Sequence, residues 1–139
     1  IDWTSKVDSN HPSYHKYDIV SVDNPLGCYG KYCENFEIIF NVHNLLANDS
    51  VLLVNIVPRP YGGDHGIPKD WDNKRREFYN LKNSNDIDFP TILETYTNIL
   101  NNNGMVITDY EYICREYADG LDYFYYLCLN LKRNVEKDN

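Results

Sequence analysis

The feature that most constrains this chain is a short apolar run that ends in an acid, an amide and a proline. The run spans Tyr17–Asp23, and Asn24 and Pro25 follow it in the stretch YDIVSVDNP. Its apolar residues would face both sides of a sheet, which is typical of a strand covered by helices on both faces. Open α/β sheets place their chemistry just beyond the carboxyl ends of their strands. We therefore expect a functional site at the end of this strand.

Helical and extended patterns alternate after this strand. Apolar residues repeat with helical spacing over Glu34–Ala47, and after a turn at Asn48–Ser50 the apolar run Val51–Val57 predicts a second buried strand. Two further helices are expected over Trp71–Tyr79 and Phe89–Asn102. In the first of these two helices one side would carry Trp71, Arg75, Phe78 and Tyr79. In the second helix the stripe expected to be buried consists of Ile92, Tyr96, Ile99 and Leu100.

The boundaries of the last helix and of the segments after it are well marked. Asp88 is a good N-cap, and Gly104 suits a left-handed turn at the helix end. Met105–Glu116 and Tyr123–Arg133 are rich in β-branched and aromatic residues, with Asp119-Gly120 between them. This pattern predicts an antiparallel hairpin at the C-terminal end of the fold.

The order of these elements predicts one α/β domain over residues 1–139, with residues 1–16 as a lead-in and 134–139 as a frayed tail. Alternation first and a hairpin last indicate a three-layer Rossmann-like mixed sheet. Two parallel strands would be joined by a right-handed crossover and followed by the antiparallel pair.

Charge and hydropathy exclude some classes of partner. The chain has 21 acidic and 13 basic side chains, which give a net charge of -8. So acidic a domain repels phosphate backbones, and the small basic cluster Lys74–Arg76 lies among acids. No apolar run reaches membrane-spanning length. We therefore expect neither nucleic acid nor a membrane as partner.

The four cysteines bear on the cellular compartment. They are Cys28, Cys33, Cys114 and Cys128. In the predicted hairpin Cys114 faces the neighbourhood of Tyr125, so a disulfide between Cys114 and Cys128 is not expected. Reduced thiols in a cytoplasmic protein are the favoured interpretation, and a secreted domain with two disulfides is the alternative.

The whole order resembles the C-terminal half of a class I S-adenosylmethionine-dependent methyltransferase. In that family a seven-stranded sheet ends with the fourth strand, a helix, the fifth strand, a helix, and a reversed hairpin of the sixth and seventh strands. The matching pieces here are YDIVSVDNP, ENFEIIFNVHNLLA, VLLVNIV, FPTILETYTNILNNNG, MVITDYEYICRE and YFYYLCLNLKR. The resemblance implies S-adenosylmethionine as cofactor and methyl transfer to a small or polar acceptor, either a small molecule or a protein.

The resemblance also implies roles for the end of the first strand. VDNP resembles the acid-x-Pro signature that in the family contacts the methionine part of the cofactor and the acceptor atom. It therefore implies cofactor-binding roles for Asp23, Asn24 and Pro25, with Asp23 as base or cofactor contact and Asn24 orienting the acceptor. The alternative is that these residues simply cap the following turn, for which Asp, Asn and Pro are well suited.

The chain departs from the family at the cofactor loop. The family's glycine-rich loop follows its first strand, and nothing before Tyr17 resembles it. We expect an incomplete methyltransferase-type sheet, which is either part of a longer enzyme or a half-fold without the cofactor site. The Tyr17–Asp23 strand would then have a bare edge, and bare edges invite pairing. A homodimer, or a missing N-terminal segment, is the partner expected at that edge.

Two loops carry further candidate residues. Tyr29 and Tyr32, beside Lys31, could form the wall of an acceptor pocket, and Asp64 with His65 could do acid–base chemistry in the glycine-rich loop after the second strand. Each loop could equally be an ordinary surface loop.

The other histidines are given structural roles. His43 lies on an apolar stripe and is expected to be a core histidine with a satisfied hydrogen bond. His11 and His15 could join Cys28 and Cys33 in a zinc site, but Pro12 opposes a helix there and the cysteine spacing is loose. No metal site is predicted.

A function of a different class remains open beside methyl transfer. The chain contains 13 tyrosines, several of them in the predicted hairpin. Tyrosine combines apolar area with a polar tip, which suits protein interfaces. A non-enzymatic interaction module, secreted or not, would use the tyrosine-rich hairpin as its contact surface.

Overall fold

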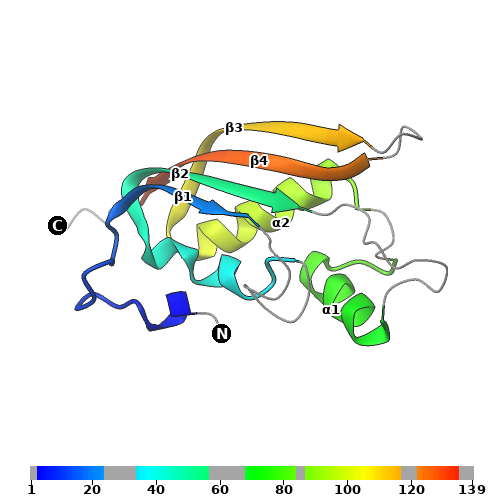
Figure 1. Ribbon diagram of the computed structural model, residues 1–139, viewed down its shortest axis with the longest axis horizontal. Helices are drawn as coiled ribbons and strands as arrows, with labels where there is room; N and C mark the ends of the chain where they lie inside the picture. Colours follow the sequence, from blue (N-terminus) through cyan, green and yellow to red (C-terminus); the bar gives the residue numbers. More distant parts are fainter. Residues whose placement is uncertain (1–2, 24–33, 57–67, 84–86, 117–121, 135–139) are drawn as a thin grey trace.

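The structure, a computed structural model, describes residues 3–23, 34–56, 68–83, 87–116 and 122–134. Within these ranges a sheet carries two α-helices on one face (Figure 1). The strands are β1 (Tyr17–Val22), β2 (Leu46–Ile56), β3 (Met105–Glu116) and β4 (Asp122–Arg133), and the α-helices are α1 (Lys69–Tyr79) and α2 (Phe89–Asn102). Short 3-10 helices are η1 (Trp3–Lys6), η2 (Ile38–Phe40) and η3 (Val42–Asn44).

The four strands of the described residues lie in the order β1-β2-β4-β3. β1 runs parallel to β2, while β4 is antiparallel to both of its neighbours, β2 and β3. This arrangement confirms the predicted mixed sheet with a parallel pair and a reversed hairpin. The predicted hairpin register is also confirmed, since Cys114 pairs with Tyr125.

The inner face of the sheet forms the core. Leu52, Val54 and Ile56 of β2 alternate with outward-facing residues, as the period of a strand requires. The matching inward residues of β4 are Leu127, Leu129 and Leu131, which are also buried. The buried stripe of α2 packs against this face as predicted, through Ile92, Tyr96, Ile99 and Leu100.

The outer face of the sheet is solvent-exposed in the described part of the chain. Ile19 of β1 is 65% exposed and Ile113 of β3 is 67% exposed. The described residues thus supply two of the three predicted layers, the sheet and the helices on its inner face. The prediction that β1 is buried on both faces does not hold for them.

The prediction of a helix over Glu34–Ala47 is wrong. That segment forms η2 and η3, and from Leu46 onward it belongs to β2. Most apolar residues of this segment are buried through two short turns, although Phe40 is 47% exposed. After these turns Leu46 pairs with Tyr17. The predicted turn Asn48–Ser50 is likewise strand, because β4 pairs with it: Asp49 lies opposite Lys132. Tertiary pairing has overridden the local pattern.

The ends of the helices follow local chemistry. Asp88 is the N-cap of α2, and its carboxylate accepts a hydrogen bond of 2.9 Å from the Thr91 amide. Gly104 has φ +80, a left-handed conformation that ends the helical segment before β3. Both features were predicted from the sequence. In α1, Arg75 and Tyr79, two of the residues predicted to share one side of the helix, are buried.

Candidate functional site at the carboxyl edge of the sheet

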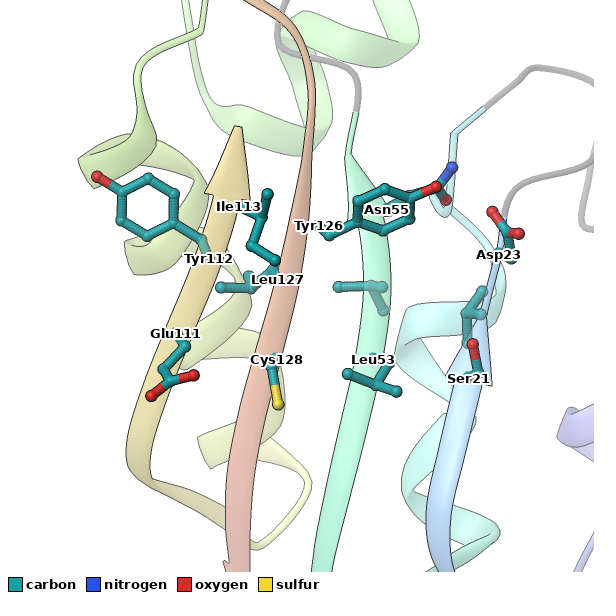
Figure 2. A pocket seen from close by; sticks show the side chains of 12 residues that line it. Ser21, Asp23, Leu53, Asn55, Glu111, Tyr112, Ile113, Tyr126, Leu127 and Cys128 are labelled. Atoms are coloured by element: carbon teal, nitrogen blue, oxygen red, sulfur yellow. The ribbon is translucent and has the colours of Figure 1, made fainter. Parts of the chain in front are cut away.

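β1 and β2 end side by side at one edge of the sheet. Val22 pairs with Val54, so the next residues along the two strands are Asp23 and Asn55. Figure 2 shows both side chains at this end, with the Asp23 carboxylate at the tip of β1. Asp23 is exposed and Asn55 is half-buried. The structure therefore places an accessible carboxylate where the sequence predicted the functional edge.

A cavity of about 310 Å³ opens beside this edge, on the outer face of the sheet. All four described strands contribute to its lining, which consists of Ser21, Val22, Asp23, Leu53, Val54, Asn55, Glu111, Tyr112, Ile113, Tyr126, Leu127 and Cys128. Its volume lies at the lower end of the range of small-molecule sites. Apolar side chains such as Leu53 and Ile113 form much of its surface, and polar groups stand around them (Figure 2).

The polar groups of the cavity differ in chemistry. Asp23 and Glu111 offer carboxylates, Asn55 an amide, Tyr126 a phenol and Cys128 a thiol. The two carboxylates come from the two end strands of the described sheet, Asp23 from the end of β1 and Glu111 from β3 (Figure 2). An apolar floor with a few polar groups is the usual composition of a small-molecule site. The sequence did not predict Asn55, Glu111 or Tyr126 as site residues, because only the pairing of β4 with β2 and β3 brings them beside Asp23.

The remaining predicted site residues lie outside the described residues. These are Asn24, Pro25, Tyr29 and Tyr32 in the segment 24–33, and Asp64 and His65 in the segment 57–67. The structure therefore brings none of them together with Asp23, and their roles stay predictions.

Glu34, the first described residue after the segment 24–33, forms a buried ion pair with Arg75 of α1. The Arg75 guanidinium donates to the Glu34 carboxylate, and Trp71 Nε1 donates to the same carboxylate at 2.7 Å. The neighbouring Asn35 amide donates to the carbonyl oxygen of Asn55 at 3.0 Å. These hydrogen bonds join residues 34–35, which follow β1 in the sequence, to α1 and to the carboxyl end of β2. The sequence analysis did not predict this ion pair; the position of Arg75 on the same side of the helix as Trp71, Phe78 and Tyr79 is the signal that could have indicated it.

The groups in this network are strongly desolvated. Burial raises the pKa of Glu34, although the charge of Arg75 and its hydrogen bonds oppose that shift. Burial likewise raises the pKa of Tyr79 and of Tyr96. Arg75 also lies 5.7 Å from the centre of the Tyr79 ring. Both tyrosines therefore stay protonated at neutral pH and can only act there as hydrogen-bonding groups.

The opposite edge of the sheet gathers basic groups. Arg133 Nη2 donates to the carbonyl oxygens of His43 and Leu46, at 3.0 and 2.6 Å. Burial, and next the charge of Arg133, lower the pKa of both His15 and His43. His43 is half-buried, and a backbone hydrogen bond with Phe40 opposes the lowering of its pKa.

Metal ligands and membrane spans were also sought among the described residues. They contain no group of three or more His, Cys, Asp or Glu side chains that could hold a metal ion. None of their helices is long and apolar enough to cross a membrane. Neither Cys114 nor Cys128 forms a disulfide.

No protein-family model matches the sequence of this chain, and no curated protein matches it. Eleven solved chains match its structure. A variant of the 16S rRNA (adenine(1408)-N(1))-methyltransferase of Catenulisporales acidiphilia, solved with the cosubstrate SAM, has a TM-score of 0.52 at 12% identity; the match covers 91% of this chain and 58% of that one.

Two further solved structures are similar to a lesser degree. TYW2 of M. jannaschii in complex with AdoMet has a TM-score of 0.48 at 12% identity, over 90% of this chain and 42% of that one. A SAM-dependent methyltransferase of Thermotoga maritima has a TM-score of 0.45 at 9% identity, over 89% of this chain and 60% of that one. The chain thus spans about half the length of the structures it matches. Its strand order and its likeness to the adenine methyltransferase show that it has the class I methyltransferase-like fold.

Proposed function

We propose that this chain forms the acceptor-side half of an S-adenosylmethionine-dependent methyltransferase domain, which transfers a methyl group to a small or polar acceptor. The observation that carries the proposal is the strand order β1-β2-β4-β3, with an exposed carboxylate, Asp23, at the tip of β1. This is the order expected of the fourth, fifth, seventh and sixth strands of that family. A fold alone hosts many functions, so Asp23 and its cavity carry the chemical part of the proposal.

The described residues fit one end of the cofactor. An exposed carboxylate at a strand tip can accept hydrogen bonds from the ammonium group of a methionine moiety, and Asp23 is such a group. Asn24 and Pro25 would complete this contact. The described residues offer no glycine-rich cradle for the adenosine end, so the proposal requires that another segment of the domain supplies it.

S-adenosylmethionine would supply an electrophilic methyl group on a sulfonium, and transfer of that methyl group to the acceptor would leave the sulfur as a neutral thioether. The residues of this chain would align the acceptor and remove its proton. Asp23 is the candidate base, with His65 as the second candidate, while Tyr29, Tyr32 and Asp64 would contact the acceptor. Alignment by such groups is the main contribution that a protein makes to direct displacement.

The surface charge bears on the choice of acceptor. A net charge of -8 opposes the approach of a nucleic-acid backbone. A small molecule or a protein is therefore the proposed acceptor. The proposed acceptor therefore differs in class from the 16S rRNA named for the methyltransferase to which the fold of this chain is similar.

Calorimetric titration with S-adenosylmethionine, and separately with its demethylated product, tests the proposal directly. The titrations are run on this chain and on any longer natural protein that contains it. We expect binding where the cofactor loop is present, and a loss of at least about tenfold in affinity for Asp23→Ala. Asp18→Ala, an exposed acid on the same strand, is the matched control and should bind normally. Absence of binding in both proteins would sink the proposal.

The edge of β1 forms a further part of the proposal. In the described sheet β1 is an end strand, and its Ile19–Val22 stretch pairs with β2 in regular register on one side only. We propose that a strand from a second copy or from a preceding segment pairs with its other side. Light scattering and amide hydrogen exchange across 19–22 test this. A monomer with no companion chain and rapidly exchanging amides would contradict it.

A second candidate function is favoured by the exposure of the hairpin. Tyr110, Tyr112 and Tyr126 are 43%, 48% and 40% exposed. A non-enzymatic module that binds a protein through these tyrosines would show no affinity for S-adenosylmethionine in any length of chain. Counting titratable thiols adds a second test, because two disulfides would favour the secreted form of such a module.

A further inference from the structure

β3 is the end strand of the described sheet on the side opposite β1, and it is 12 residues long. β4 pairs with it in regular register from Asp109 to Arg115. An end strand presents the backbone N–H and C=O groups of alternate residues to the side that faces away from its partner. We call this side of residues 109–114 the β3 edge. The companion strand proposed for β1 would lie at the other end of the sheet, so the two edges are independent.

The β3 edge is protected only at its start. A bulge interrupts the pairing between Ile107 and Asp109, and the Tyr110 amide donates to the Asp109 carboxylate at 2.9 Å. A bulge discourages the addition of another strand, and so do proline and lysine on an end strand. The described stretch YEYIC, residues 110–114, contains neither proline nor lysine. These residues therefore lack two of the safeguards that commonly block pairing.

The two faces of β3 differ in chemistry. Glu111 and Ile113 line the cavity on the outer face of the sheet (Figure 2). Tyr110 and Tyr112 alternate with them, and their ring centres lie 5.9 and 3.9 Å from that of Phe89, at the start of α2. Ile113 is 67% exposed, and both tyrosines are exposed as well. A strand added here would meet an acid on one face and an aromatic cluster on the other.

The charge along this edge has one sign. Between Met105 and Cys114 the charged residues are Asp109 and Glu111, and both are exposed. They are two positions apart, so they fall on the same face of the strand. The chain as a whole carries a net charge of -8. Both the local and the overall charge therefore favour a cationic partner.

We propose that the β3 edge binds an extended segment of a partner protein in which lysine or arginine alternates with aliphatic residues. Main-chain hydrogen bonds to the edge supply affinity in this mode of recognition, and alternate side chains supply specificity. The basic side chains would lie beside Asp109 and Glu111, and the aliphatic ones beside Tyr110 and Tyr112. Residues 109–114 extend over about 20 Å, enough for about six residues of the partner.

The same observations argue against three other occupants. A second copy of this chain would bring a second net charge of -8 and the same two acids to the edge. An acidic segment is disfavoured for the same reason, because like charges across an interface reduce affinity. An α-helix cannot pair with the edge, since its backbone groups are bonded within the helix. The inference does not depend on methyl transfer, because it rests on β3 alone.

The experiment measures binding of a fluorescent peptide of about nine residues, in which lysine and valine alternate, by anisotropy. Hydrogen exchange of the full chain, read by mass spectrometry, locates the site. We expect the peptide to slow exchange across residues 109–114 and to leave residues 19–22 of β1 unchanged. A matched peptide with glutamate in place of every lysine should bind at least about tenfold more weakly.

Two backbone-methylated peptides test the pairing itself. One carries N-methyl groups on its valines and the other on its lysines, so charge and side chains are unchanged. In an added strand the amides of alternate residues face β3. We therefore expect one of the two peptides to lose binding by at least about tenfold and the other to retain it.

A pair of variants tests the charge. Glu111→Lys should weaken binding of the lysine peptide by about tenfold, whereas Glu94→Lys, the same change at an exposed site on α2, should leave it unchanged. Circular dichroism confirms that both variants are folded. Equal binding of the lysine and glutamate peptides, equal binding of the two methylated peptides, or binding of none would overturn the inference. Exchange across 109–114 that slows with chain concentration alone would overturn it in favour of a second copy.

Discussion

Glu34 and Arg75 form an ion pair across 41 residues of sequence, and both side chains are shielded from solvent, with 4% and 0% of their surface exposed. The pair joins the chain that follows β1 to the helix that follows β2. A buried ion pair contributes little net stability relative to apolar residues of similar size, but loss of one partner leaves an uncompensated buried charge. The ion pair therefore acts mainly by fixing the position of α1 relative to the segment that follows β1.

Removal of one member of this pair is predicted to destabilise the fold severely. Arg75→Met leaves the Glu34 carboxylate buried without its counter-charge, and we expect a loss of about 3–5 kcal/mol in the free energy of unfolding. The double variant Glu34→Leu with Arg75→Met should recover most of that loss. Urea denaturation followed by circular dichroism measures both.

The exposed pair on the same helix provides the control. Arg76 donates to Asp72 at 3.1 Å, and the two side chains are 40% and 33% exposed. Arg76→Met should therefore cost less than about 1 kcal/mol, as for other surface pairs. Equal losses for Arg75→Met and Arg76→Met would contradict the buried pair.

Stability is predicted to decline as the pH falls below 6.5. His15 and His43 have lowered pKa values in the folded protein relative to 6.5, chiefly because burial disfavours their charged forms. The unfolded chain therefore binds more protons than the folded one between the lowered pKa values and 6.5. Stability from these groups is complete above pH 6.5 and is lost as the pH falls below it.

Comparison with variants isolates this histidine contribution from other titrating groups. The raised pKa of Glu34 acts in the opposite direction, since stability from that group falls as the pH rises. We expect His43→Gln to flatten the decline measured by thermal unfolding from pH 7.5 to 5.5. His11→Gln, at an exposed site, should follow the parent curve. A decline unchanged in His43→Gln would refute the assignment.

The N-cap of α2 is predicted to contribute about 1 kcal/mol. Asp88→Ala removes the acceptor for the Thr91 amide and leaves that donor without a side-chain cap. Asp88→Ser keeps a capping oxygen and should retain most of the stability. Because the hydrogen bonds from Thr91 lower the pKa of Asp88, this contribution should be lost as the pH falls below about 4. Chemical denaturation of both variants at pH 7 and pH 3 checks the two statements.

Substitution of Gly104 is predicted to destabilise the fold through backbone strain alone. The residue has φ +80, and a Cβ built there meets no atom within 4 Å, so there is no steric clash to relieve. Gly104→Ala should cost about 1 kcal/mol, while Gly104→Asn should cost less because asparagine tolerates this conformation. Equal melting temperatures for Gly104→Ala and the parent protein would show that the turn relaxes.

Much of the sheet was predictable because its signals are local. The apolar run of β1, the two aromatic runs of β3 and β4 and the Asp88–Gly104 boundaries of α2 each depend on neighbours in sequence. The position of Asp23 followed from the rule that parallel strands end at a common edge. The order β1-β2-β4-β3 was accessible only through the resemblance to a family.

The errors arose where distant segments decide the conformation. Leu46 belongs to β2 because it pairs with Tyr17 of β1. Asp49 belongs to β2 because it pairs with Lys132 of β4. The spacing of apolar residues over Glu34–Ala47 contains no information about either pairing partner, Tyr17 or Lys132. The cavity beside Asp23 was missed for the same reason, since Glu111 and Tyr126 reach it from the far end of the chain. The pairing of Arg75 with Glu34 was missed as well, because the two residues lie 41 positions apart in the sequence.

The strand order has a consequence for how this fold forms during synthesis. β4, the last of the described strands in sequence, lies between β2 and β3, and both of those strands are made before it. Domains fold as the chain emerges from the ribosome, N-terminal parts first. Here β1 and β2 can pair early, but β3 can join them only through β4. A ribosome-bound chain therefore cannot complete the described sheet until β4 has emerged, and the edges of β2 and β3 stay unpaired until that step.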